Sequence, residues 1–594
     1  MRVSDYIIGF LKDKGVKHIF MLSGGQAMFL NDALARTPEI EPICVHHEQA
    51  AGMAAEAYGR VTEHLGVAMV TAGPAAVNVL NGVVGAYVDS SPMMVISGQS
   101  HLPNVRLMEK TGIRQCGLQG IYIRPMAEPV TKYFVTLDDP AEVSYHLEKA
   151  YAIATSGRKG PVWIDVPLDI QRMEVPEKLL RHFEGIKEKT LIPTQGDIDE
   201  TVALLNKAKR PLLYLGQGVR ISGAYKETRK LIERIGAPVV TARLGIDLIE
   251  SDHPLFMGRP GLYGDRYSNA AVQMADVIVV IGARLDPGAI GWDPGDWGRN
   301  ARKIIVDIDE KELGKLDDLT NIRKVHSDAK AFVNQLLEAI GKKKLAKRDK
   351  WIKHLQWVKK TYPTVDPSYK KETPVNSYYF SERLSALASP HDTVVVDTSS
   401  PFHVVCQAWD LKKGQHFLTT GGISTMGYWV AGIGAAKATK KGQTIVVTGD
   451  GCLQMNIQEF ATVAHNKLPL KLFVINNNGY LLIRHTQKKH MESRFIGESP
   501  KTGVWCPKST TIAKAYGLHT VDITSPIGID KKIQEVLDYD GPVVCDVLSP
   551  EWQVVQPYVS SQKLPDGRMI SKPIEDLFPF LPKEELEKVM NFTE

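Results

Sequence analysis

The chain has 594 residues, enough for three or four domains with buried cores. Its 72 Lys and Arg residues nearly balance 67 Asp and Glu residues, and the resulting charge of +5 argues against a nucleic-acid partner. Six cysteines without a CxxC pair argue against a zinc site or a disulfide framework and favour the reducing cytoplasm. The sequence has neither a membrane-spanning apolar run nor a signal-peptide pattern, so no membrane partner is expected.

Residues 1–185 alternate short apolar strands with helices. The strands are predicted at 18–22, 43–47, 66–71, 93–98 and 162–166, which indicates a parallel α/β sheet. Glu48, in the segment VHHEQAAGMAAEAYGR, stands between a strand end and an Ala-rich helix. Such a carboxylate is either a first-turn residue favoured by the helix dipole or a functional group, and its position alone leaves both open.

Residues 190–340 form a second αβ region with three buried strands. They lie in RPLLYLGQGVR (210–220), ADVIVVIGARLDPG (275–288) and ARKIIVDIDEKELGK (301–315). Each strand is followed by Gly or Asp at its carboxyl end, where Rossmann-like sheets hold nucleotides. The triplet Gly216-Gln217-Gly218 alone is too short for a dinucleotide fingerprint. The Lys-rich run at 342–348 is predicted to be a solvated linker.

Residues 365–555 contain a third sheet and the most informative stretch, QTIVVTGDGCLQMNIQEFATVAHNKLPLKLFVINNNGY (443–480). It reads as strand, turn, helix, strand, turn, with strands apolar enough for a parallel sheet covered on both faces. A parallel crossover brings Asp450 and Asn477 to one sheet edge although they are 27 residues apart. Gly449 and Gly451 allow close approach of a ligand. A carboxylate and an amide oxygen suit Mg²⁺ with a diphosphate.

Two further segments of this region, and the tail of the chain, have recognisable sequence patterns. DTSSPFHVV (397–405) follows the strand 393–396, and GGISTMGYWVAGIGAA begins at Gly421. The tail from Tyr558 has turn chemistry at 564–567 and little helical period, which predicts a lid over a site or a strap between subunits.

Taken together, these motifs resemble the thiamine-diphosphate-dependent acetolactate synthase-like family, which includes branched-sugar synthases. The resemblance runs from the N-terminus to about Val555, and the segments 71–99 and 160–171 add to it. It implies three Rossmann-like, doubly wound parallel-sheet domains. These are a pyrimidine-binding domain (1–185), a central domain (190–340) and a diphosphate-binding domain (365–555), followed by a tail or lid (556–594).

The resemblance also implies roles for individual residues. Asp450, Asn477 and the backbone carbonyl of Gly479 would hold Mg²⁺. Gly449 and Gly451, which flank Asp450, would belong to the cofactor site. Glu48 would bind the aminopyrimidine, the Ser424 carbonyl would receive its 4′-amine, and Met426 would hold the cofactor bent, unless it is simply a core residue. His403 matches the histidine of the diphosphate loop, while Ser399, Pro401 and Phe402 depart from its two glycines and glutamine. Gly25 and Gln119 match positions lining the reaction space, although a plain turn glycine is the alternative for Gly25.

In acetolactate synthases the central domain carries FAD, and Gly216, Gly218, Arg284, Asp286 and Asp307 stand at matching places. Relatives with this domain carry ADP or nothing, so FAD, ADP and an empty domain stay open. The family pairs Glu48 and Asp450 across subunits, which implies a homodimer or homotetramer with active sites between subunits.

The expected function is a carboligase that decarboxylates a 2-oxo acid, pyruvate being the expected donor, and transfers the two-carbon unit to a carbonyl acceptor. The alternatives are a 2-oxo acid or acyl-CoA decarboxylase and a catalytically inactive cofactor-binding subunit. Thr486 stands where the synthases have Trp, and Leu168 where Lys is usual. These departures predict an acceptor larger or more polar than a second 2-oxo acid, unless other side chains refill the gap.

Overall fold

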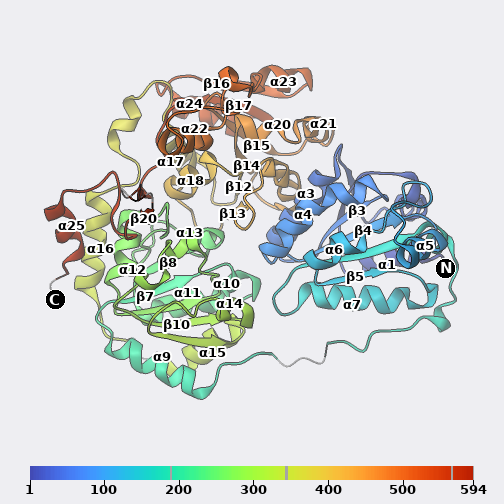
Figure 1. The fold of residues 1–594 in the computed structure, drawn as a ribbon, viewed down its shortest axis with the longest axis horizontal. Coiled ribbons are helices and arrows are strands. Elements are labelled where there is room, and N and C mark those ends of the chain that lie inside the picture. The colour runs from blue at the N-terminus through green and yellow to red at the C-terminus, as the bar shows by residue number, and fades with distance from the viewer. Residues whose placement is uncertain (187–189, 342–344, 564–565, 567, 593–594) are drawn as a thin grey trace.

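The computed structural model describes residues 1–186, 190–341, 345–563, 566 and 568–592. Figure 1 shows three α/β lobes, the N-terminal one in blue, the central one in green and the C-terminal one in orange. Each lobe is built on one parallel sheet. The predicted fold class is therefore confirmed. The sheets fall inside the predicted segments 1–185, 190–340 and 365–555, whose limits stay predictions.

The N-terminal sheet has six parallel strands in the order β2-β1-β3-β4-β6-β5. They are β1 (His18–Met21), β2 (Glu41–Cys44), β3 (Gly66–Val70), β4 (Met93–Gln99), β5 (Tyr133–Thr136) and β6 (Pro161–Pro167). All but the edge strand β5 correspond to strands predicted from the sequence. The carboxyl ends of β1 and β3 are followed by the turns that carry Gly25 and Gly73.

The other two sheets are also parallel, with the orders β11-β10-β9-β7-β8 and β13-β12-β14-β15-β17-β16. The central strands are β7 (Pro211–Leu215), β8 (Val239–Thr241), β9 (Val277–Ile281), β10 (Arg302–Asp307) and β11 (Ile322–His326). The C-terminal strands are β12 (Thr393–Val396), β13 (His416–Thr419), β14 (Thr444–Gly449), β15 (Leu470–Asn476), β16 (His519–Ile523) and β17 (Val543–Leu548).

The predicted βαβ unit is present. Strands β14 and β15 are parallel neighbours, with Gly449 opposite Ile475. The crossover between them is broken into α20 (Asp450–Gln454), η9 (Ile457–Glu459) and α21 (Phe460–His465).

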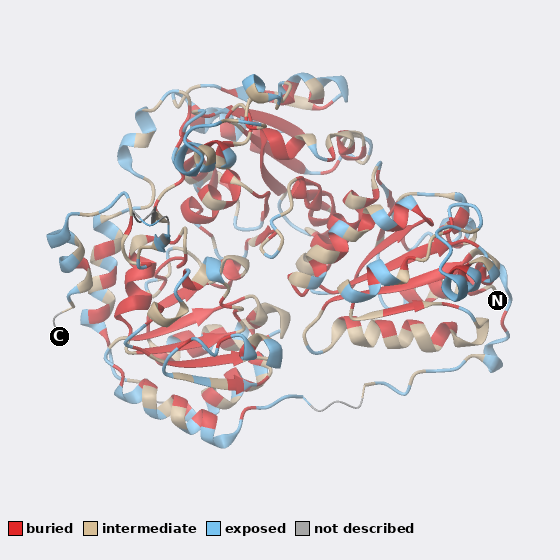
Figure 2. Ribbon diagram, in the orientation of Figure 1, coloured by how far each residue is buried: buried red, intermediate tan, exposed pale blue. Residues whose placement is uncertain are grey.

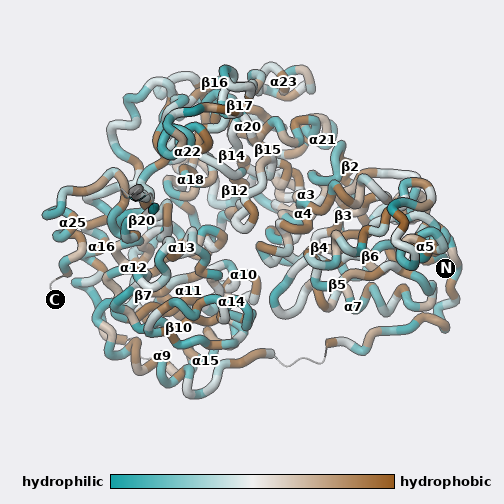
Figure 3. Tube along the Cα trace, viewed as in Figure 1, coloured by the Kyte–Doolittle hydropathy of each residue, from teal (hydrophilic) through white to brown (hydrophobic). Residues whose placement is uncertain are grey.

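The strands are apolar because both faces of each sheet are covered. In Figure 2 the buried residues follow the strands, and in Figure 3 hydrophobic stretches run through all three lobes. The N- and C-terminal lobes share one apolar core through α3 (Glu48–Thr62), α4 (Pro74–Val88) and α19 (Ala431–Ala438). A Cβ on Gly434 would lie 1.8 Å from the Ala54 carbonyl oxygen, so α3 and α19 meet backbone to backbone.

The connection into the third lobe differs from the predicted solvated linker. Residues 342–344 of the Lys-rich run lie outside the described residues. Arg348, however, is buried and donates to the carbonyl oxygens of Leu205 and Ala208. The following α16 (Asp349–Thr361) buries Trp351 and Leu355 in the core of the central lobe.

The tail lies along the central lobe of its own chain, as Figure 1 shows in red. The Val559 N–H donates to the Leu262 carbonyl at 2.7 Å, and the Asn269 side chain donates to the Ile574 carbonyl at 2.6 Å. The segment thus acts as an intramolecular strap. Three of the four predicted turn residues at 564–567 lie outside the described residues. Across the described ranges, we find no helix long and apolar enough to cross a membrane.

Candidate functional site

Two oxygen groups that can bind a cation lie at neighbouring strand ends of the C-terminal sheet. Asp450 follows β14, is 5% exposed, and accepts the N–H groups of Gly451 at 3.0 Å and Gly479 at 2.8 Å. Asn477 follows β15 and is 4% exposed. Its side-chain N–H donates to the Ser400 hydroxyl at 3.4 Å, whereas its side-chain oxygen has no hydrogen-bond partner among the described residues.

These two side chains fit a bound Mg²⁺. Burial raises the pKa of Asp450 to about 7, although the N–H groups of Gly479 and Gly451 oppose the rise. A buried acceptor without a donor costs about 1–3 kcal/mol, and a cation would relieve both groups. The donor set consists of oxygen atoms only, which suits Mg²⁺ completed by phosphate and water. Within the described part of the chain, no three His, Cys, Asp or Glu residues gather in a metal-binding cluster.

The loop after β12 brings a helix N-terminus to the same place. Helix α18 (Ser400–Ala408) begins after Ser399, which has φ +68°. Glycine adopts this left-handed conformation at less cost, in keeping with the glycine of the family pattern at Ser399. Because the Asn477 side chain contacts Ser400, the first turn of α18 lies beside Asn477. Free N–H groups at a helix start suit phosphate oxygens.

His403 lies one turn further along α18 and faces the central lobe. Its ring stacks on Tyr263 with 3.9 Å between ring centroids, and an Arg243 nitrogen lies 3.1 Å from its Nδ1. Burial, together with the Arg243 charge, lowers the pKa of His403 well below its ordinary value. The imidazole is therefore neutral, and its contacts are on the side of the central lobe rather than at Asn477.

Glu48 begins α3 and is 7% exposed. Its Oε2 accepts the Asn78 side-chain N–H at 2.9 Å. Two residues earlier, the His46 N–H donates to the fully buried Glu459 of the C-terminal lobe at 2.9 Å. Across the described residues, no hydrogen bond joins Glu48 to Asp450.

Gly25 and Gln119 both lie against the turn that follows β3. The N–H of Gln26, next to Gly25, donates to Thr71 Oγ1 at 3.2 Å. A Cβ on Gly73 would lie 2.5 Å from the Gln119 carbonyl oxygen. A Cβ on Gly25 would meet nothing within 4 Å, so Gly25 borders open space.

The loop between β13 and η8 (Tyr428–Val430) carries Ser424 and Met426. Ser424 is exposed, has φ +49° and lines the cavity described next, and Met426 is half-buried. The loop is anchored to the N-terminal lobe, because the Gly421 N–H donates to the Asp89 carboxylate at 3.1 Å.

A cavity of about 470 Å³ lies where the three lobes meet. This volume is within the range of small-molecule sites. Four of the five residues predicted for a nucleotide line it, namely Gly218, Arg284, Asp286 and Asp307. Gly216 does not. It packs behind the wall, where a Cβ would lie 2.1 Å from the Gly282 carbonyl oxygen.

Two buried polar atoms in residues lining this cavity have no hydrogen-bond partner among the described residues. They are the Tyr214 hydroxyl and Oδ1 of Asp89. Burial raises the pKa of Asp89 to about 6, against the opposing charges of Arg60 and Arg284. An Arg284 nitrogen lies 3.8 Å from the same Asp89 oxygen, so that oxygen has an ion-pair partner. The Tyr214 hydroxyl has no partner among the described residues, and a ligand with hydroxyl or amino groups, such as a nucleotide, would satisfy it.

Comparisons with known proteins agree with the division into three lobes. Three family descriptions match in order: "Thiamine pyrophosphate enzyme, N-terminal TPP binding domain" over residues 1–120, its central domain over 198–336, and its C-terminal TPP binding domain over 397–547. The acetolactate synthase isozyme 1 large subunit of Escherichia coli (strain K12) is 30% identical, covering 94% of this chain and 95% of that protein. The chain belongs to the acetolactate synthase-like family of thiamine-diphosphate enzymes.

Other relatives have similar coverage. The probable acetolactate synthase large subunit of Methanocaldococcus jannaschii is 30% identical over 97% of this chain and 96% of that protein. The Corynebacterium glutamicum acetolactate synthase large subunit is 30% identical over 93% of this chain and 88% of that protein. This acetolactate synthase-like chain is thus an enzyme, a thiamine-diphosphate-dependent carboligase. The decarboxylase and inactive-subunit alternatives are not favoured.

A buried polar network joins the N- and C-terminal lobes of this acetolactate synthase-like chain and was not predicted from the sequence. Tyr428 donates to Glu56 at 2.5 Å, Ser91 donates to Glu56 at 2.6 Å, and Arg60 donates to the Thr419 carbonyl at 3.0 Å. The sequence did contain a signal for it, because Glu56 and Arg60 stand four residues apart in the Ala-rich helix α3. Charged residues buried in such a helix need partners.

Proposed function

We propose that this chain decarboxylates pyruvate and transfers the resulting two-carbon unit to a carbonyl acceptor. The observation that carries the proposal is the buried side-chain oxygen of Asn477, which has no partner among the described residues and lies near Asp450 and the start of α18. That arrangement supports a site for Mg²⁺ and diphosphate held by Asp450, Asn477 and the Gly479 carbonyl.

When bound, thiamine diphosphate supplies an electron sink that stabilises the negative charge left when a 2-oxo acid loses CO₂. The chain's own residues have four tasks toward it. Glu48 would hold a proton at the pyrimidine N1′, and the Ser424 carbonyl would accept from the 4′-amine. Met426 would hold the cofactor bent. Gly25 and Gln119 would line the reaction space, where the Gly25 N–H suits a developing oxyanion.

We propose that the active enzyme is at least a homodimer. Within one chain Glu48 is bonded to Asn78 and its turn to Glu459, and neither contact involves Asp450. A second copy that brings its Glu48 to this chain's Asp450 would complete two equivalent sites. The six free thiols support the cytoplasm as the compartment.

We propose that the central cavity holds FAD, with ADP as the alternative. The unpaired Tyr214 hydroxyl and the lining residues Gly218, Arg284, Asp286 and Asp307 support a nucleotide there. Purified protein should be yellow and show a flavin absorbance band. A colourless preparation that ignores added FAD would leave ADP or an empty cavity.

The acceptor is proposed to be bulkier or more polar than a second 2-oxo acid. Thr486, at the position of the synthase Trp, is exposed and donates to the Leu482 carbonyl at 2.9 Å, and Ile483 beside it is 46% exposed. A Thr at this position has less bulk than the synthase Trp, which supports a wider space for the acceptor.

The decisive assay supplies purified protein with thiamine diphosphate, Mg²⁺, pyruvate and a panel of acceptors, and identifies products by mass spectrometry. The panel contains pyruvate alone, 2-ketobutyrate and a nucleotide-linked keto-sugar. A product with a new C–C bond is expected. Free aldehyde alone would reject carboligation, and efficient acetolactate formation with no bulkier product would reject the open pocket.

A further inference from the structure

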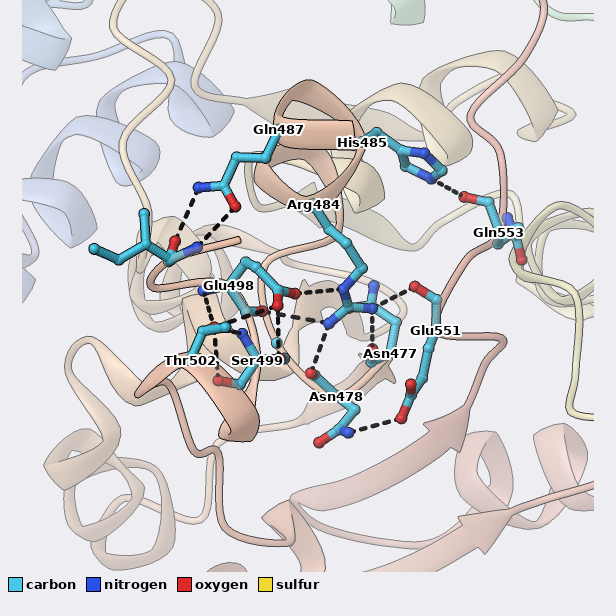
Figure 4. A network of polar contacts seen from close by, with 12 residues as sticks. Asn477, Asn478, Arg484, His485, Gln487, Glu498, Ser499, Thr502, Glu551 and Gln553 are labelled. Carbon is cyan, nitrogen blue, oxygen red and sulfur yellow. Dashed lines mark hydrogen bonds and ion pairs between the residues drawn. The ribbon is translucent and has the colours of Figure 1, made fainter. Parts of the chain in front are cut away.

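Arg484 lies directly behind the loop that carries Asn477 and Gly479. It belongs to α22 (Leu481–His490) and is 2% exposed. Figure 4 shows its guanidinium at the centre of a polar network. The acceptors of its N–H groups are the Glu498 carboxylate at 2.6 Å and the carbonyl oxygens of Asn477 at 3.3 Å, Asn478 at 2.9 Å, Glu498 at 3.3 Å and Glu551.

The loop that Arg484 contacts has a demanding backbone conformation. Asn478 has φ +60° and Gly479 has φ +125°. A Cβ on Gly479 would lie 2.2 Å from the Glu498 carbonyl oxygen, and the Tyr480 N–H donates to that same oxygen at 2.8 Å. The carbonyl oxygens of Asn477 and Asn478 accept hydrogen bonds from Arg484 on one side of the loop. On the other side, the Gly479 N–H donates to Asp450.

We propose that Arg484, paired with Glu498, is a positioning residue that holds the metal-binding loop ready for Mg²⁺. The proposal rests on the function proposed above, because it assigns Asp450, Asn477 and Gly479 to the metal. Groups behind a ligand loop orient the ligands, and their loss typically lowers metal affinity about 10–100-fold.

The chemistry of the network requires arginine. A guanidinium has five N–H donors in a fixed plane, and the five acceptors found here use all of them. Lysine offers three donors and would leave buried carbonyl oxygens unpaired. Glu498 balances the buried charge, and Ser499 donates to its carboxylate at 2.7 Å.

The same contacts argue against the substrate role that a basic residue near a reaction space suggests. Since every N–H of Arg484 has a protein acceptor, none is left for a substrate carboxylate. Arg484 is also absent from the residues lining the cavity between the lobes, which its neighbour Leu482 does line. Loss of Arg484 should therefore affect metal retention and leave pyruvate recognition unchanged.

The test compares Arg484→Met and Arg484→Lys with Arg494→Met in the full chain. Arg494 is a matched control, because its ion pair with Glu492 in the same segment spans 2.6 Å at the surface. With thiamine diphosphate present, Arg484→Met should need about 10–100-fold more Mg²⁺ for half-maximal cofactor retention. Its KM for pyruvate at saturating Mg²⁺ should equal that of wild type. Arg494→Met should match wild type in both.

A second readout needs no cofactor. In the metal-free chain, hydrogen–deuterium exchange at the Gly479 and Tyr480 amides should accelerate in Arg484→Met and stay unchanged in Arg494→Met. If Arg484→Met fails to fold, Glu498→Gln, which keeps an acceptor oxygen, should shift the Mg²⁺ requirement the same way by a smaller factor.

Two results would overturn the proposal. One is an unchanged Mg²⁺ requirement with unchanged amide exchange. The other is a raised KM for pyruvate with an unchanged Mg²⁺ requirement, which would make Arg484 a substrate contact. Failure of the underlying function is distinguishable, because wild type itself would then not retain thiamine diphosphate with Mg²⁺.

Discussion

At the scale of single residues, Asn477 has an unpaired buried oxygen whose purpose can be tested. Asn477→Ala should leave the melting temperature of the cofactor-free protein nearly unchanged, since among the described residues its side chain loses just the long hydrogen bond to Ser400. The rise in melting temperature on adding thiamine diphosphate and Mg²⁺ should disappear, because mass-action stabilisation requires binding. Thermal scans with and without ligand measure both.

The control for this variant is Asn478→Gly. It removes the adjacent amide, which donates to Glu551 at 2.7 Å, yet permits the φ of +60°. Asn478→Gly should keep the ligand-induced rise. A rise retained by Asn477→Ala would show that its oxygen is not a metal ligand.

Glu48 is the residue proposed to activate the cofactor. Glu48→Gln preserves shape and the contact with Asn78 but cannot hold the proton. It should bind thiamine diphosphate and slow exchange of the cofactor C2 proton by about 10²–10⁴-fold, the usual cost of losing a positioned acid–base group. Proton exchange followed by NMR measures this, and an unchanged rate would remove Glu48 from the assignment.

Asp165 is a buried carboxyl group whose titration should make the stability of the protein depend on pH. Burial raises its pKa from 3.8 to about 6, although Ser97, Gln99 and Thr136 donate to it. The folded state therefore binds more protons than the unfolded state between these values. The stabilisation is fully present below about pH 3.8 and is lost as pH rises through about 6.

Asp165→Asn removes this titration. The unfolding free energy of wild type relative to Asp165→Asn should fall by up to about 3 kcal/mol between pH 4 and pH 7. Thermal unfolding at several pH values measures this, because the melting temperature of wild type should fall relative to that of Asp165→Asn as the pH rises. The exposed Asp138→Asn should run parallel to wild type, and a parallel curve for Asp165→Asn would refute the linkage.

At the scale of elements, most strands that the sequence did not reveal lie at sheet edges. They are β5, β8, β11, β13 and β16, each with one paired neighbour. The strands β8 and β13 have three and four residues, too few for a clear apolar run, and β11 is interrupted by its exposed Arg323. The inner strand β17 was missed for another reason, since Asp546 interrupts its apolar run to bind Ser509 and Asn476.

The predicted placement of Asp450 and Asn477 at one sheet edge was correct, because one βαβ unit determines that geometry. Asp450 and Asn477 follow adjacent parallel strands, and sequence alone brings them together. Contacts between segments far apart in the sequence could not be predicted, because no sequence pattern like that of the βαβ unit indicates them. The stacking of His403 on Tyr263 and the burial of Arg484 depend on side-chain directions that no local period encodes. Their assignment required the structure.

The turn before Glu48 depends on the C-terminal lobe. Glu459 accepts the His46 N–H and the Thr462 hydroxyl, the latter at 2.6 Å. Glu459→Ala should expose the His46 amide to faster hydrogen–deuterium exchange and slow C2-proton exchange by up to about 100-fold, as displaced catalytic groups do. Glu459→Gln, which retains an acceptor oxygen, should recover most of both.

Glu39→Ala is the matched control for this turn, because Glu39 is an exposed carboxylate near the start of β2. It should behave as wild type. Normal C2-proton exchange in Glu459→Ala, despite a freely exchanging His46 amide, would show that the turn need not be held for Glu48 to work.

At the scale of the whole molecule, the proposed dimer predicts complementation. Glu48→Gln and Asp450→Ala homodimers should each be inactive. A mixed dimer, purified through two different tags, contains one site with both wild-type residues and should recover roughly half the wild-type activity. An inactive mixed dimer would mean that each chain supplies both residues to one site.

The cavity between the lobes has a consequence for biosynthesis. Its walls include Ser90 and Arg158 from the N-terminal lobe and Tyr214 and Asp307 from the central lobe. The last lining residue in the sequence is Leu482, in the C-terminal lobe. A nascent chain on the ribosome has made the complete central sheet long before the last wall emerges. The nucleotide proposed for this cavity therefore meets a complete set of walls only after most of the chain has been synthesised, and α16 and the tail, which complete the core of the central lobe, are also made late.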